Sequence, residues 1–268
     1  MKSVCDFSKM KRKGQKISMV TCYDYTSACI VSQSDVDCIL VGDSLAMTMH
    51  GHDSTVMAVP DMMALHTAAV KRGAPETFIV GDMPFLSYRK SLSESIAVAG
   101  ALMQAGAQAV KLEGAAGNTE LVTHLVQSGI PVMGHIGLTP QFVHQIGGYK
   151  VQGKSKECAA RLKEEARALE EAGCFALVME CVPASLAEEI TKAAGIATIG
   201  IGAGRGTDGQ VLVWQDMLGL NTEFQPKFVR RYTNGAEIFT KALNDYVDDV
   251  QKGAFPADEN CFWHRSVA

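Results

Sequence analysis

The chain has 268 residues, of which 47% are hydrophobic and 20% are charged, a balance typical of a globular protein with a large core. Its length is close to the roughly 250 residues of a single α/β barrel. The formal net charge of −4 argues against nucleic acid as a partner, and the sequence has no run of about 18 apolar residues that would predict a membrane span.

The first segment is basic, with positive side chains at Lys9, Lys11, Arg12, Lys13 and Lys16. A nucleic-acid-binding arm would explain this cluster, but we favour a solvated leader over about residues 1–16. No apolar stretch follows the charges, so a secretory signal is not expected.

Eight short apolar runs rich in Val and Ile follow along the chain, and each is too short for a helix. They are typical of parallel strands covered on both faces. The predicted strands are residues 17–22, 38–41, 78–80, 109–112, 131–133, 176–179, 198–201 and 211–213.

Helical patterns separate these runs. Pro60-Asp61 opens one helix, and Gly73 closes it. Ser91 and Glu94 predict a capping box before a helix that ends at about residue 105. Residues 157–172 and 183–194 are two further predicted helices, each followed by glycine. The tail, at about residues 254–268, has no periodicity and is expected to be irregular.

Strand and helix alternate about eight times without a break in composition, which fits an open doubly wound sheet or a closed (β/α)8 TIM barrel. We favour the barrel, because polar residues follow many of the strands, whereas an open sheet would concentrate them at one switch point. The sequence therefore predicts a single domain over residues 1–268.

Four predicted strands end in an acid: Asp43, Asp82, Glu113 and Glu180. Taken alone, Asp43 or Asp82 would also suit a helix N-cap. Four acids at equivalent positions instead favour convergence at one barrel mouth, where the carboxyl ends of the strands hold catalytic groups.

Lys111 lies two residues before Glu113, so both side chains are predicted on the same side of their strand. A structural ion pair between them is the alternative to a site role. Oxygen ligands without nearby thiolates or paired histidines favour Mg²⁺. A metal, a lysine and a spare carboxylate suit proton abstraction beside a carbonyl, with the lysine offsetting enolate charge.

His135 follows the fifth strand at the same mouth. A lone histidine is commonly a structural hydrogen bonder, and a role in substrate binding is the alternative. The glycine-rich stretch at 200–206 lacks the Lys-Ser/Thr of a P-loop. It predicts a tight turn or a close backbone approach to a ligand. Residues 148–153 are expected to form a loop near the mouth.

The eight cysteines contain no Cys-x-x-Cys pair, and Cys22, Cys38 and Cys181 fall in apolar, strand-like runs. Buried free thiols in a reducing cytoplasm are therefore expected, rather than disulfides or a zinc site.

A series of motifs in order, over about residues 10–256, resembles the ketopantoate (3-methyl-2-oxobutanoate) hydroxymethyltransferase family. The motifs are Thr-Cys-Tyr-Asp-Tyr (21–25), Leu-Val-Gly-Asp-Ser-Leu (40–45), Gly-His-Asp-Ser-Thr (51–55), Asp-Met-Pro-Phe (82–85), Val-Lys-Leu-Glu-Gly (110–114), Gly-His-Ile-Gly-Leu-Thr-Pro-Gln (134–141), Gly-Gly-Tyr-Lys-Val-Gln-Gly (147–153), Glu-Cys-Val-Pro (180–183), Ile-Gly-Ile-Gly-Ala-Gly (199–204) and Thr-Asp-Gly-Gln-Val-Leu-Val (207–213). Ala46 and Ile136 depart from the family pattern without removing a charge.

The resemblance implies a (β/α)8 barrel, commonly a decamer, that transfers a hydroxymethyl group from 5,10-methylenetetrahydrofolate to 3-methyl-2-oxobutanoate through a Mg²⁺-stabilised enolate. The product would be 2-dehydropantoate, on the way to pantothenate. By the matching motifs, Asp43, Asp82 and Glu113 would hold Mg²⁺. Ser44 and Lys111 would contact the keto acid, and Glu180 would remove its C3 proton.

Two alternatives stay open. The first is a Mg²⁺-dependent lyase or mutase of the phosphoenolpyruvate type, which would not need folate. The second is a barrel that binds a ligand without turnover.

Overall fold

The computed structural model describes residues 1–223 and 225–263. The chain divides into two compact units, one ending at Trp214 and the other beginning at Gln215. The barrel therefore ends earlier in the chain than a single domain over residues 1–268 predicts.

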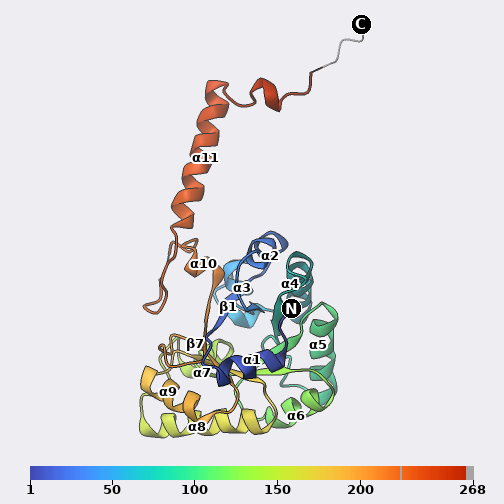
Figure 1. Cartoon of the computed structure of the whole chain (residues 1–268), viewed down its shortest axis with the longest axis vertical. Helices are drawn as coiled ribbons and strands as arrows, with labels where there is room; N and C mark the ends of the chain where they lie inside the picture. The colour runs from blue at the N-terminus through green and yellow to red at the C-terminus, as the bar shows by residue number, and fades with distance from the viewer. Residues whose placement is uncertain (224, 264–268) are drawn as a thin grey trace. The chain divides into compact units, whose positions relative to one another are not determined.

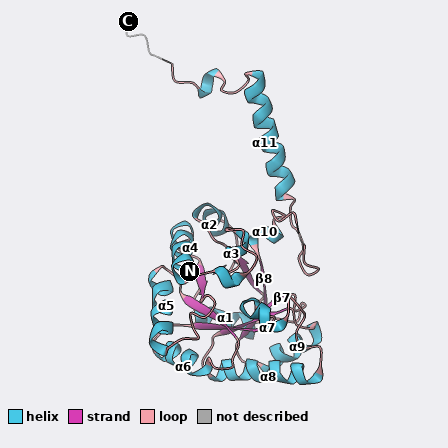
Figure 2. Ribbon diagram, turned by 180° about the vertical axis from the view of Figure 1, so that it is seen from behind, coloured by secondary structure: helices cyan, strands magenta, loops and turns pink. Residues whose placement is uncertain are grey.

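Within the described residues, the strands of the first unit form one closed, parallel barrel in the order β1 to β8 (Figure 2). This confirms the predicted (β/α)8 fold and excludes the open sheet. The strands are β1 (Ile17–Thr21), β2 (Cys38–Val41), β3 (Phe78–Asp82), β4 (Ala109–Glu113), β5 (Val132–Gly137), β6 (Ala176–Glu180), β7 (Ala197–Ile201) and β8 (Gly209–Leu212).

Three strands run further than predicted and include the acid that follows each apolar run: Asp82, Glu113 and Glu180. The sequence-based strand boundaries stopped one or two residues before these acids. In a barrel, the last inward-facing position of a strand lies at the mouth, where a charge can meet other polar groups. A charged residue therefore does not end the strand there.

Helices surround the strands, as Figure 1 shows for α4, α5, α6, α8 and α9. The predicted helix boundaries hold within one or two residues at α4 and α8, and Ser91 caps α5 in the predicted capping box. The helices are α2 (Tyr25–Ser32), α3 (Leu45–Thr48), α4 (Pro60–Gly73), α5 (Leu92–Gln104), α6 (Thr119–Gln127), α7 (Val143–Ile146), α8 (Lys156–Glu171) and α9 (Ala184–Ala193), with short 3₁₀ turns η1 (Thr55–Met57) and η2 (Pro140–Phe142).

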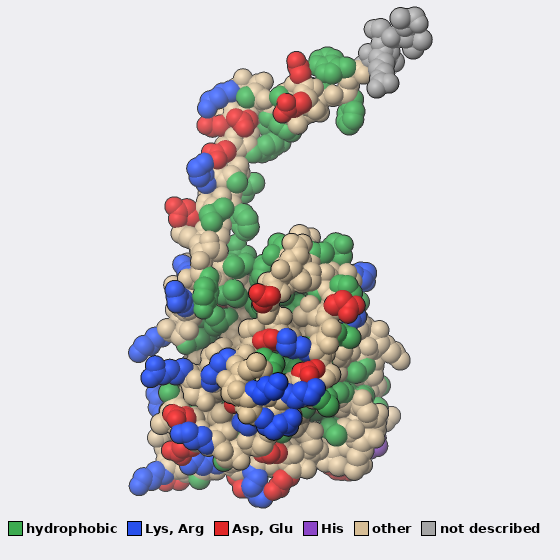
Figure 3. All heavy atoms as spheres, viewed as in Figure 1, with side chains coloured by type: hydrophobic (Ala, Val, Ile, Leu, Met, Phe, Trp, Pro, Cys, Tyr) green, Lys and Arg blue, Asp and Glu red, His purple; other side chains and the backbone are tan. Residues whose placement is uncertain are grey.

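The N-terminal segment is helical, which corrects the expectation of a solvated leader. Helix α1 (Val4–Arg12) buries Phe7, which is only 1% exposed. The Phe7 ring lies 5.2 Å from Phe78 and 5.3 Å from Phe175, centroid to centroid. These two residues lie at the amino ends of β3 and β6, so α1 closes the bottom of the barrel. The basic side chains of this segment lie on the surface over α1 (Figure 3).

Alternate residues of each strand fill the barrel interior, including Phe78 and Val80 on β3, Ala109 on β4, and Ala176 and Val178 on β6. Because side chains alternate along a strand, the next inward positions are Asp82 on β3, Lys111 and Glu113 on β4, and Glu180 on β6. The apolar core thus leads directly into the charged mouth.

The cysteines are all free, as predicted. Cys22 and Cys38 are buried, but Cys181 is only partly buried, contrary to the expectation for this residue. It follows β6 and takes a left-handed backbone conformation, with φ of 47°, so it belongs to a turn at the mouth and not to the strand.

The second unit contains α11 (Gly235–Lys252) and the 3₁₀ turn η3 (Asp258–Asn260), and α10 (Trp214–Met217) begins at its boundary. Gly253 ends α11 in a left-handed conformation. The predicted irregular tail, about 254–268, is irregular apart from η3 as far as residue 263, and residues 264–268 lie outside the described part. Among the described helices, none is both long enough and apolar enough to cross a membrane.

Candidate active site

Strand register brings the predicted site residues together at the carboxyl ends of the strands. Asp82 of β3 is paired in register with Lys111 of β4. Glu113 of β4 is paired with His135 of β5, and β6 follows with Glu180 at its end. The Lys111 Nζ lies 2.9 Å from Asp82 Oδ1, with both side chains almost fully buried.

His135 lies between two carboxylates. Its Nδ1 is 3.4 Å from Glu113 Oε1, and its Nε2 is 3.3 Å from Glu180 Oε2. The Glu113 side chain is 1% exposed, whereas the Glu180 side chain is 18% exposed. Glu180 is therefore the carboxylate of this pair that a small molecule at the mouth can reach.

The electrostatics of the mouth disfavour additional negative charge. Burial raises the pKa of Asp43 well above its usual value, and the charges of Asp82 and Glu113 raise it further. Burial also raises the pKa of Asp82, although Lys111 opposes the increase. A cation placed among these carboxyls would relieve their repulsion.

The two cationic groups are held in their charged forms by the same carboxylates. Burial alone would lower the pKa of Lys111, but Asp82, Glu113 and Asp43 together raise it. Burial and the Lys111 charge would lower the pKa of His135, but hydrogen bonding to Glu113 and Glu180 outweighs them and raises it to about 9. The mouth thus combines acids with two fixed positive charges.

At these positions the structure shows neither a helix cap by Asp43 or Asp82 nor an ion pair between Lys111 and Glu113. Ser91, and not Asp82, caps α5, and Ser44 occupies the N-cap position of α3. Lys111 makes its ion pair with Asp82 on the neighbouring strand, instead of with Glu113 on its own strand. Asp82 Oδ2 also accepts the backbone N–H of Asp43 at 3.1 Å, which links the ends of β2 and β3.

Gln141, for which the sequence predicts no role, connects three parts of the mouth. Its Nε2 donates to Asp43 Oδ2 at 2.8 Å and to the Met83 carbonyl at 3.0 Å. Its backbone N–H donates to Glu113 Oε2 at 3.1 Å, and its Oε1 accepts from the Tyr88 hydroxyl at 2.6 Å. The signal in the sequence was a polar residue in the segment after the fifth strand, directly following Pro140.

Ser44 lies at the start of α3 next to Asp43, and its Oγ is 2.8 Å from the Tyr23 hydroxyl. The Tyr23 phenol is buried, and burial raises its pKa further above its usual value. It therefore stays protonated and orients the Ser44 hydroxyl at the mouth.

Among the described residues, Asp82 Oδ1 and Glu113 Oε1 are buried carboxylate oxygens without a well-aligned hydrogen bond, although Asp82 Oδ1 lies 2.9 Å from Lys111 Nζ and Glu113 Oε1 lies 3.4 Å from His135 Nδ1. Unsatisfied buried oxygens of this kind suit a hard cation. In the described ranges, no three His, Cys, Asp or Glu side chains are grouped as a ready-made metal cage. Mg²⁺ commonly binds through one or two carboxylates and keeps several waters, so one or two of the carboxylates of Asp43, Asp82 and Glu113 could hold it in that manner.

The two glycine-rich segments form a turn and a loop. The stretch at 200–206 begins in the last two residues of β7 and then turns, and a Cβ on Gly204 would lie 2.5 Å from the Ala184 Cβ, so only glycine fits this turn. The predicted loop at 148–153 lies at the mouth. The N–H of Gln152 donates to the Cys181 carbonyl at 2.9 Å, and the charges of Glu180, Asp43 and Glu113 act on the Tyr149 hydroxyl.

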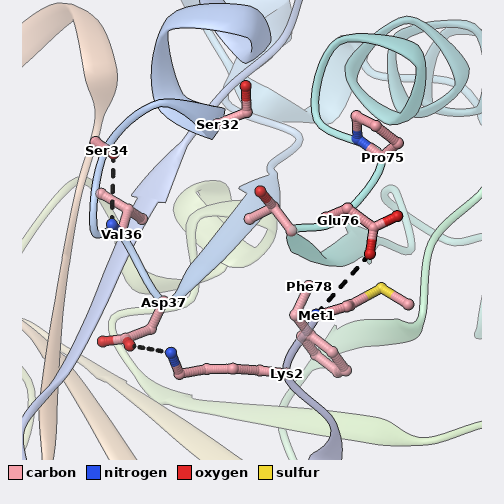
Figure 4. Close-up of a pocket in the computed structure, with 10 residues that line it drawn as sticks. Met1, Lys2, Ser32, Ser34, Val36, Asp37, Pro75, Glu76 and Phe78 are labelled. Carbon is pink, nitrogen blue, oxygen red and sulfur yellow. Dashed lines mark hydrogen bonds and ion pairs between the residues drawn. The ribbon is translucent and has the colours of Figure 1, made fainter.

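A second hollow lies at the opposite end of the barrel, where Figure 4 shows Lys2 beside Asp37 and the Met1 amine directed toward Glu76. The Lys2–Asp37 distance is 2.7 Å. The two acids of this hollow, Asp37 and Glu76, are already paired with cations of the N-terminal segment. We therefore assign the candidate active site to the mouth.

The fold and the mouth define a class of protein, namely a (β/α)8 barrel with a carboxylate-rich mouth. Among solved structures, the chain is similar to 2,3-dimethylmalate lyase (TM-score 0.59, 14% identity, 99% of this chain and 91% of that chain). It is also similar to phosphonopyruvate hydrolase in complex with oxalate and Mg²⁺ (TM-score 0.62, 10% identity, 97% and 93%). At these identities the likeness concerns the fold.

The comparison of sequences identifies the family, which the comparison of folds does not. The ketopantoate hydroxymethyltransferase family matches residues 2–258. A 3-methyl-2-oxobutanoate hydroxymethyltransferase of Legionella pneumophila (strain Paris) is 58% identical over 258 residues, covering 96% of this chain and 98% of the relative. The enzyme of the same name from Coxiella burnetii (strain CbuG_Q212) is 58% identical over 259 residues, covering 96% and 97%. The chain belongs to the ketopantoate hydroxymethyltransferase family, which confirms the resemblance found in the sequence.

Proposed function

We propose that this chain transfers a hydroxymethyl group from 5,10-methylenetetrahydrofolate to 3-methyl-2-oxobutanoate, forming 2-dehydropantoate for pantothenate synthesis. The family supports hydroxymethyl transfer. The observation that carries the mechanism is the division of the mouth into two parts: a buried group around Asp82 and Lys111, and the more exposed Glu180 beyond His135.

Asp43, Asp82 and Glu113 would hold Mg²⁺, which supplies Lewis-acid polarisation of the keto oxygen when bound. Lys111 stays cationic and offsets the negative charge that develops on the substrate oxygen. Ser44, oriented by Tyr23, would hydrogen-bond the keto acid.

Glu180 would act as the general base. It accepts the C3 proton, and the C–H electron pair forms the C2–C3 double bond of the enolate. Water would release the one-carbon unit from the two folate nitrogens as formaldehyde, breaking both C–N bonds and leaving tetrahydrofolate. The electron pair of the enolate C2–C3 double bond would then form the new bond from C3 to the formaldehyde carbon, which restores the keto group, and the formaldehyde oxygen would take up a proton to become the hydroxyl group. His135, charged between Glu113 and Glu180, would hold the Glu180 carboxylate in place and is also a candidate for contacting the substrate carboxylate.

The test is incubation with 3-methyl-2-oxobutanoate, Mg²⁺ and 5,10-methylenetetrahydrofolate, with the product detected by mass. We expect product only when all three are present, and EDTA is expected to abolish turnover until Mg²⁺ is restored. Cleavage of a 2-oxo or 2-hydroxy acid without folate would instead identify a lyase or mutase. Binding without any turnover would identify a non-catalytic barrel.

We further propose that the chain forms a homo-oligomer, a decamer by analogy with the family. Helix α11 exposes a row of apolar side chains, seen along one side of it in Figure 3: Ile238, Phe239, Leu243, Tyr246, Val247 and Val250. Such a row favours burial against another surface. Light scattering is expected to give a multiple of 28.7 kDa, and a stable monomer would contradict the proposal.

The free thiols support a cytoplasmic location.

A further inference from the structure

Outside the mouth, two histidine rings from different segments face each other. His50 follows α3, and His66 lies on α4. Their Nε2 atoms are 3.0 Å apart. The rings are almost perpendicular, at 88°, with their centroids 5.2 Å apart. His50 is exposed and His66 is partly exposed, so an ion in solvent can reach the pair.

The hydrogen bond at the other side of His66 fixes its tautomer. His66 Nδ1 lies within hydrogen-bond distance of the Tyr23 carbonyl oxygen. A carbonyl can only accept, so Nδ1 carries the hydrogen, and in the neutral ring Nε2 presents its lone pair to His50. Metal-binding histidines are typically oriented in this way, through a second ring nitrogen bonded to a backbone carbonyl.

Both rings are held by well-anchored backbone. The buried side chains of Met63, Thr67 and Val70 seat α4 against the barrel. The His50 N–H donates to the Leu45 carbonyl at 3.3 Å, and Gly51, with φ of 70°, turns the chain after it. The two rings are therefore held next to each other before any ligand arrives.

We infer that His50 and His66 form a chelating site for a divalent transition-metal ion of the Zn²⁺, Ni²⁺ or Cu²⁺ class. Imidazole nitrogens prefer these ions over Mg²⁺. Two nitrogens, each about 2.1 Å from one ion, lie about 3.0 Å apart at a right angle and about 3.4 Å apart at a tetrahedral angle. The observed separation of 3.0 Å matches the right-angled case. The centroid distance of 5.2 Å shows that the two nitrogens face each other almost head-on, so both rings must turn to direct their lone pairs at one ion. Since no third His, Cys, Asp or Glu ligand groups with them in the described residues, water fills the other positions.

A bound ion would tie the segment after α3 to α4. Asp43 and Ser44 lie directly before α3, and His66 contacts the carbonyl of Tyr23, whose hydroxyl bonds Ser44. The competing explanation is a plain N–H···N hydrogen bond between the two rings, which would have no affinity for metal.

Retention of the untagged full chain on immobilised Ni²⁺ tests the site, because the resin-bound ion can reach surface rings but not the buried carboxylates of the mouth. We expect the wild type to be retained and eluted by imidazole. His50→Asn and His66→Asn are expected to elute much earlier. The asparagine at position 66 keeps an N–H for the Tyr23 carbonyl while removing Nε2. His124→Asn, which changes an exposed histidine on α6, is the matched control and should elute with the wild type.

Calorimetry with free Ni²⁺ gives the second readout. Removing either ring should weaken binding at this site on the order of a hundredfold, because two linked donors bind far more tightly than one. Asp82→Asn, which alters the mouth, should leave this binding unchanged. Flow-through of the folded wild type, or equal retention of the wild type and both histidine variants, would overturn the inference. If His66→Asn does not fold, His50→Asn alone decides, since the exposed His50 ring does not support the core.

Discussion

The two ends of the barrel are built by the same strands and differ in almost every other respect. At the bottom, Phe7 packs between Phe78 and Phe175, where β3 and β6 begin. At the mouth, the inward positions of the same strands carry Asp82 and Glu180. A change from apolar to acidic side chains thus occurs within four or five residues of each strand.

Because of this difference, we expect the bottom to determine the stability of the barrel and the mouth to determine its turnover. The aromatic bottom is stabilised by removing apolar surface from water. The mouth concentrates buried carboxyls, which raises the pKa of Asp43 and Asp82, and like charges at close range are destabilising without a cation. Changes at the mouth should therefore alter turnover, and changes at the bottom should alter unfolding.

The largest effect is expected from Glu180→Gln. This variant keeps the shape of the side chain and a hydrogen-bonding group near His135 but cannot accept the C3 proton. We expect turnover to fall on the order of 10²–10⁴-fold, measured by product formation at saturating substrates, with little change in the unfolding midpoint. Near-normal turnover would show that another group is the base.

At the bottom, Phe7→Ala should produce the opposite result. Removing a buried phenyl ring is expected to lower the free energy of unfolding by about 3–5 kcal/mol, measured by urea denaturation. Turnover per folded molecule should stay near that of the wild type. Ile30→Ala, at a side chain that is 56% exposed, is the control and should change stability by less than about 0.5 kcal/mol. A loss of turnover in folded Phe7→Ala would mean that the two ends are coupled.

Asp82→Asn sharpens the assignment within the mouth. If Asp82 holds Mg²⁺ and thereby positions the keto acid, the variant should bind both at least about tenfold more weakly. Calorimetry with each ligand on folded protein measures this. Unchanged affinity for both would leave Asp82 with a purely structural role, holding Lys111 and the Asp43 N–H.

The smallest effect concerns Asp37 at the bottom. Burial would raise its pKa, but Lys2 and Ser18 outweigh burial and lower it below the usual 3.8. Its contribution to stability is therefore present above pH 3.8 and is lost as the pH falls through the lowered pKa. Asp37→Asn should cost about 0.5–1 kcal/mol at neutral pH, and the difference from the wild type should shrink in acid. A constant difference across that range would contradict this.

The sequence predicted much of the fold and of the site. Short Val- and Ile-rich runs defined the strands, and acids at the ends of the strands indicated a shared mouth, because both signals are local. The pairing of Lys111 with Asp82 instead of Glu113 was missed, since it depends on the register between β3 and β4. Gln141 was missed because its partners lie far away in the chain, and α1 was missed because its burial rests on Phe7 alone.

The most direct test of catalysis at the mouth is deuterium exchange at C3 of 3-methyl-2-oxobutanoate in D₂O, with Mg²⁺ and without folate. This isolates proton removal from the later carbon–carbon bond formation. We predict that the wild type and Phe7→Ala exchange the C3 hydrogen, and that Glu180→Gln binds the keto acid and Mg²⁺ yet does not. Exchange by Glu180→Gln at the wild-type rate would contradict the account.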